Sequence, residues 1–81
     1  MTTISNNIIE IILATIDYKM LEIESILMKL IIEFDNQQLY SVKYKIMEVK
    51  RWLLFLQKNN LNKPLANELL LQLQIMNNIL R

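Results

Sequence analysis

Three carboxylate side chains recur at every seventh residue near the start of the chain, at Glu10, Asp17 and Glu24. Residues seven apart share one face of an α-helix, and clustered carboxylates can act as general acids and bases or bind a metal ion. The chain has no His and no Cys, so the usual general base, the thiolate nucleophile and the commonest metal ligands are missing. We therefore expect these acids to be solvated or paired with lysines, and we predict no catalytic residue, no metal site, no cofactor and no small-molecule substrate.

A second group combines bases with aromatic rings in the middle of the chain. Its members are Tyr40, Lys43, Tyr44, Lys45, Lys50, Arg51 and Trp52. Such residues can contact phosphates and stack on nucleic-acid bases, which makes a small DNA-binding regulator one alternative function. The net charge is only +1 and Glu48 lies within the group, so we favour a solvated basic face that complements an acidic helix.

Helices must position these residues, because apolar side chains recur at steps of three and four along the chain and no segment alternates like a strand. The spacing predicts helices at about residues 4–34, 38–58 and 64–80, each with a seam of the coiled-coil type. The first seam is Ile9, Leu13, Ile16, Met20, Ile23, Leu27, Leu30 and Phe34. The second is Leu39, Val42, Ile46, Val49, Leu53 and Leu56, and the third is Ala66, Leu69, Leu73, Met76 and Leu80.

Two polar segments predict where the helices end. Asp35 and Gln38 have the spacing of a capping box, and Asn59 or Asn60 is suited to a helix C-terminus ahead of Pro64 in a first turn. The fold class is therefore all-α and a single domain over residues 1–81. It is either a three-helix antiparallel bundle or a long helical hairpin with a third helix, packed like a coiled coil.

Charge favours pairing of the first two helices. Residues 4–34 carry a net charge of −3, and residues 39–58 carry +4. Opposite charges on neighbouring helices help to set their register, although each exposed pair contributes only about 0 to 1 kcal/mol. Trp52 and Phe55 lie near the second seam, so we expect them in the core or at its edge.

The first helix has a second apolar stripe, about 150° around the helix from its seam. Its members are Ile11, Ala14, Tyr18, Leu21, Met28 and Ile32. Burying a large apolar side chain contributes about 1.5 to 3 kcal/mol, so five of them represent roughly 8 to 15 kcal/mol, as much as the net stability of a typical domain. We therefore expect another chain to cover this stripe, and the predicted partner-binding residues are Ile11, Tyr18, Leu21, Met28 and Ile32.

These observations predict a non-enzymatic protein–protein interaction module, such as a small adaptor, co-chaperone or inhibitor, that presents the stripe to a partner. A self-assembling structural subunit is the alternative, and a third interpretation makes the stripe ordinary core of the same chain. The first seven residues contain no Lys or Arg and no long uncharged apolar run follows, so we expect a cytoplasmic protein without a membrane span.

Overall fold

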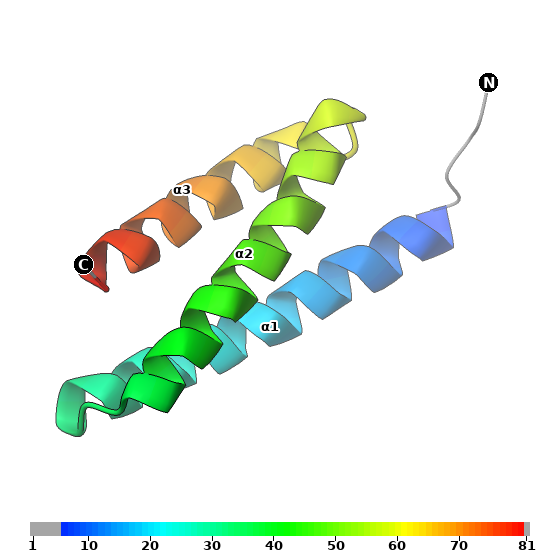
Figure 1. Ribbon diagram of the computed structural model, residues 1–81. Coiled ribbons are helices and arrows are strands. Elements are labelled where there is room, and N and C mark those ends of the chain that lie inside the picture. Colours follow the sequence, from blue (N-terminus) through cyan, green and yellow to red (C-terminus); the bar gives the residue numbers. More distant parts are fainter. Residues whose placement is uncertain (1–5, 81) are drawn as a thin grey trace.

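The computed structural model describes residues 6–80, which form three α-helices and no strand (Figure 1). The helices are α1 (Asn6–Ile32), α2 (Asn36–Lys58) and α3 (Lys63–Ile79). Successive helices run in opposite directions, and the molecule is an elongated bundle of 48 × 19 × 15 Å. The prediction of an all-α, three-helix antiparallel bundle is confirmed. None of the helices in residues 6–80 has the length and apolarity needed to cross a membrane.

The break between α1 and α2 lies close to its predicted place but differs in detail. Asp35 is the N-cap of α2, and its Oδ1 accepts a hydrogen bond from the backbone N–H of Gln37 at 2.9 Å. Because the cap residue must be extended, α1 ends at Ile32, two residues earlier than predicted. Phe34 therefore lies beyond the helix and is exposed, so the prediction that it continues the seam is wrong. Residues 4 and 5, where we expected α1 to begin, lie outside the described residues.

The turn between α2 and α3 uses asparagine where many proteins use glycine. The backbone N–H of Leu61 donates to the carbonyl of Leu56, and that of Asn60 donates to the carbonyl of Gln57, which is the hydrogen-bond pattern of a Schellman motif. The motif requires a left-handed residue, and Asn60 supplies it with φ 55°. Pro64 then lies in the first turn of α3, as predicted, where a missing N–H disrupts no helical hydrogen bond.

The core is centred on α2, which packs against both other helices. Its predicted seam is buried from Val42 to Leu56. In α1 the seam is buried from Ile16 to Leu27, and in α3 Ala66 and Leu73 are buried. The pairing of the first two helices that their charges favoured is present, and α3 also packs against α2. No Cα atom of α1 comes within 8 Å of one in α3.

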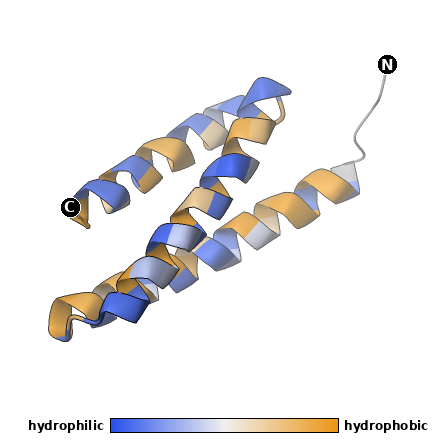
Figure 2. Ribbon diagram, in the orientation of Figure 1, coloured by the Kyte–Doolittle hydropathy of each residue, from blue (hydrophilic) through white to orange (hydrophobic). Residues whose placement is uncertain are grey.

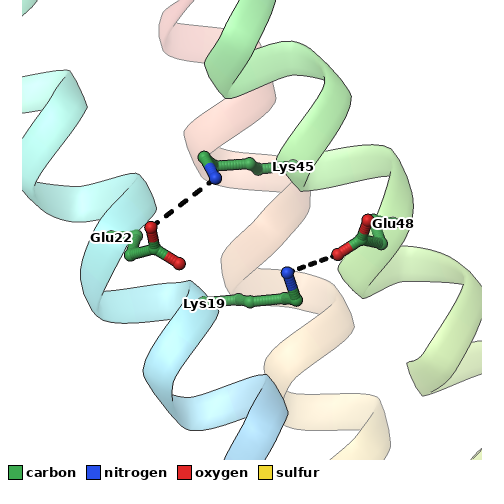
Figure 3. Close-up of polar contacts among 4 residues, drawn as sticks. All are labelled: Lys19, Glu22, Lys45 and Glu48. Atoms are coloured by element: carbon green, nitrogen blue, oxygen red, sulfur yellow. Dashed lines mark ion pairs between the residues drawn. The ribbon is translucent and has the colours of Figure 1, made fainter.

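Two ion pairs join α1 to α2 (Figure 3). Lys19 Nζ lies 2.5 Å from Glu48 Oε1, and Lys45 Nζ lies 3.6 Å from Glu22 Oε2. The hydrogen bond between Lys19 and Glu48 lowers the pKa of the Glu48 carboxyl and raises the pKa of the Lys19 amine. Partial desolvation opposes both shifts but has the smaller effect. Each helix supplies one acid and one base, so the pairs fix the register of the two helices by reciprocal contacts.

The expected charge complementarity of α1 and α2 is therefore only partly realised. Of the five bases that α2 carries, only Lys45 has an ion-pair partner within residues 6–80. Glu10, Asp17 and Glu24 pair with no base in the part of the chain that the structure describes. Most of the acidic charge of α1 and most of the basic charge of α2 thus face solvent.

Candidate functional site

The second apolar stripe of α1 faces solvent in the folded bundle. We call its five large residues the outer stripe: Ile11, Tyr18, Leu21, Met28 and Ile32. Their exposed fractions range from 58% for Leu21 to 85% for Ile32. The buried seam lies about 150° around α1 from the outer stripe, and Leu21 at the edge of the stripe borders Leu65 and Leu69 of α3. The interpretation of these residues as core of the same chain does not describe the structure.

Two hollows lie between α1 and α3, which both pack against α2 and have no Cα atoms within 8 Å of each other, and we refer to the two hollows together as the groove. One end of the groove is lined by Leu13, Asp17, Met20, Leu21, Glu24, Leu65, Leu69 and Gln72. The other end is lined by Leu27, Leu30, Ile31, Phe34, Leu39, Ile79 and Leu80. Leu21 belongs to both the outer stripe and the groove, so the two features form one surface.

A row of exposed apolar residues on α3 meets this groove at one of its members, Ile79. Leu71, Ile75 and Ile79 are each more than half exposed. Residues four apart on an α-helix advance by about 40° per step, so the row winds around α3 and enters the groove at Ile79. Sequence reasoning missed this row, although its spacing of four outside the seam was a signal that could have found it.

The charged side chains along the groove are acidic. Asp17 and Glu24 line it directly, and no Lys or Arg is among the residues that line either end. Glu10 continues the strip of Asp17 one step earlier on α1, and Glu68 lies one turn before Gln72 on α3. The groove therefore combines an apolar floor with a negatively charged rim.

A second exposed surface, which we call the α2 ridge, lies on the side of α2 that points away from the core. It consists of Tyr40, Tyr44, Met47, Arg51, Leu54 and Lys58, which are all exposed. Their spacing of 4, 3, 4, 3 and 4 is the same rhythm as that of a helix-packing seam. Lys43 and Lys50 flank it and are also exposed, so the ridge is apolar, aromatic and basic. In Figure 2 the hydrophilic segments of α2 alternate with hydrophobic ones along the whole helix.

Trp52 and Phe55 lie beside the ridge, at the edge of the core. Their rings make an edge-to-face contact with centroids 6.4 Å apart and an interplanar angle of 85°. Each is about two-fifths exposed, so neither belongs to the buried core.

The carboxylates of the α1 strip do not converge on a site for chemistry. Within residues 6–80, no three acidic side chains come together in a group that could hold a metal ion. Comparisons with protein-family models, with curated proteins and with solved structures find no match for this chain.

Proposed function

We propose that this protein is a non-enzymatic protein-binding module that presents the outer stripe of α1 to another polypeptide, as small adaptors, co-chaperones and inhibitors do. One observation carries the proposal: the five large side chains of the outer stripe remain mostly exposed after three helices have packed. A row of exposed apolar side chains of this length, interrupted only at Ser25, favours association because water is released when a second chain covers it.

The supporting evidence extends beyond α1. The groove and the row on α3 continue the apolar surface onto a second helix, which gives a partner two rims to contact and a floor between them. An amphipathic helix seated there would complete a local four-helix bundle, which is a common mode of helix recognition.

A photo-crosslinking experiment in the cells that produce the protein tests the proposal. Benzoylphenylalanine replaces Tyr18, which is aromatic and exposed, and in a control protein it replaces Lys63, which is exposed at the start of α3 away from the outer stripe. We expect covalent adducts to another polypeptide from position 18 and few from position 63. Equal yields from the two positions would contradict the proposal.

A paired substitution links the adducts to the outer stripe. Leu21→Glu with Met28→Glu places two charges on the stripe, and we expect the adducts from position 18 to disappear while the helical circular-dichroism signal is retained. Helicity should survive because both side chains are more than half exposed. A control with the same change in net charge elsewhere, Lys63→Glu, should leave the adducts unchanged. Loss of helicity only in the first variant would show that the stripe is part of the core.

A further inference from the structure

We infer that the groove between α1 and α3 binds the α2 ridge of a second copy of this chain, so that copies associate head to tail. This inference rests on the proposed protein-binding function and adds the identity of the partner. The occupied surface would include the groove side of the outer stripe and the exposed row on α3.

Charge favours this pairing over the two symmetric pairings, groove with groove and ridge with ridge. A groove packed against another groove would bring Asp17 and Glu24 of both copies together, with no base among the lining residues to compensate. A ridge packed against another ridge would likewise bring the basic side chains of Arg51 and Lys58 from both copies together. Only a ridge in a groove places bases beside acids, and like charges at an interface disfavour the alternatives.

The shape and length of the α2 ridge also fit the groove. The α2 ridge has the three-and-four rhythm that lets one helix pack between two others. From Tyr40 to Lys58 it spans about 27 Å at roughly 1.5 Å per residue, and the lining residues of α1 from Leu13 to Ile31 span the same length. The apolar knobs Tyr44, Met47 and Leu54 would face the aliphatic side chains of the groove.

The two surfaces lie on opposite sides of the molecule. The residues that line the end of the groove nearest Leu13 come from α1 and α3 alone. The ridge lies on the face of α2 opposite its buried seam, and Met47 at the edge of the ridge borders Asn77 and Leu80 of α3. Figure 1 shows α2 in front, with α3 and much of α1 behind it. A contact between two different surfaces leaves one groove and one ridge free, so it continues into a ring or an open chain.

Complementation between two association-defective variants tests this arrangement. The groove variant carries Leu21→Gln with Ile79→Gln, two exposed residues that line the two ends of the groove, and the ridge variant carries Met47→Glu with Arg51→Glu. We expect the mass of the unmodified protein to rise with concentration in sedimentation, and each variant to associate at least tenfold more weakly. An equimolar mixture should then form a one-to-one pair, because it contains one intact groove and one intact ridge.

Controls separate this contact from loss of folding and from general charge effects. All proteins should retain the same helical circular-dichroism signal. Gln37→Glu with Lys63→Glu changes the net charge by as much as the ridge variant, at exposed positions off both surfaces, and it should associate like the unmodified protein.

Three results would overturn the inference. They are a ridge variant that associates normally, a mixture that stays monomeric, and an unmodified protein that is a 9.7 kDa monomer at every concentration. In each case adducts from position 18 to a different protein would still support the proposed function. Absence of both self-association and adducts would remove the proposed function as well.

Discussion

Truncating two leucines, one from the core and one from the outer stripe, should separate the two apolar faces of the bundle by their effect on stability. Leu53 in α2 is fully buried, whereas Leu21 in α1 is 58% exposed. Both lie well inside their helices, so Leu→Ala changes the same atoms in the same secondary structure. The comparison therefore reports the burial of each side chain in the folded monomer.

The expected magnitudes differ clearly. Leu53→Ala removes buried atoms and leaves a cavity, which costs about 2 to 5 kcal/mol of unfolding free energy. Leu21 buries only about two-fifths of its side chain, so Leu21→Ala should cost roughly 0.5 to 1 kcal/mol, before the slightly better helix propensity of Ala is counted. Denaturant unfolding can resolve a difference of more than about 1 kcal/mol between the unfolding free energies of the two variants.

The assay is urea unfolding followed by far-ultraviolet circular dichroism at low protein concentration, where association contributes least to stability. The same measurement at high concentration provides a second readout. If Leu21 lies in an interface, its truncation should become more costly as the concentration rises, because binding stabilises the folded state. The cost of truncating Leu53 should not change with concentration in this way.

A Leu21→Ala variant as unstable as Leu53→Ala at low concentration would refute the reasoning. It would mean that Leu21 is as buried in the isolated chain as Leu53. The case for a free apolar face on α1 would then fail, together with the functional proposal built on it.

Two further predictions concern the ends and the contacts of the helices. Asp35→Ala should lower the unfolding free energy by about 1 kcal/mol, because Gln37 loses its capping acceptor, whereas Asp35→Asn should retain most of it in the same urea titration. Glu48→Gln should remove the ion pair with Lys19. The contribution of this pair to the unfolding free energy is constant between pH 4.5, the ordinary pKa of Glu48, and pH 10.5, the ordinary pKa of Lys19. In the folded protein the pKa of Glu48 is lowered and that of Lys19 is raised. The stabilisation by the ion pair is therefore lost as the pH falls through the lowered pKa of Glu48, or as it rises through the raised pKa of Lys19. A stability difference from the unmodified protein that persisted in acid would contradict the role of the pair.

The helices and their buried seams could be predicted from the sequence because both depend on local spacing. Val42, Val49 and Leu56 recur at helical intervals, and such a row predicts one face of a packed helix. The polar segments at Asp35 and Asn60 likewise act within a few residues of themselves, so the helix ends were predicted to within about two residues.

Some details of the fold depended on competition between neighbouring residues. Phe34 fits the seam by its spacing, yet the requirement of Asp35 for an extended backbone ends α1 before it. The pairing of α1 and α2 was predicted from the net charges of an acidic first helix and a basic second helix. In the ion pair between Lys19 and Glu48, however, α1 supplies the base and α2 supplies the acid. A net charge per helix does not determine which side chains meet.

The sequence by itself determined that α1 has two apolar faces. Tertiary structure alone decided that the second face stays uncovered, that α1 and α3 stand apart, and that an acidic groove opens opposite a basic ridge. The physical reason is that periodicity fixes the directions of side chains around one helix axis. The position of a neighbouring axis is set by the packing of all three helices together, and it cannot be read from any one of them.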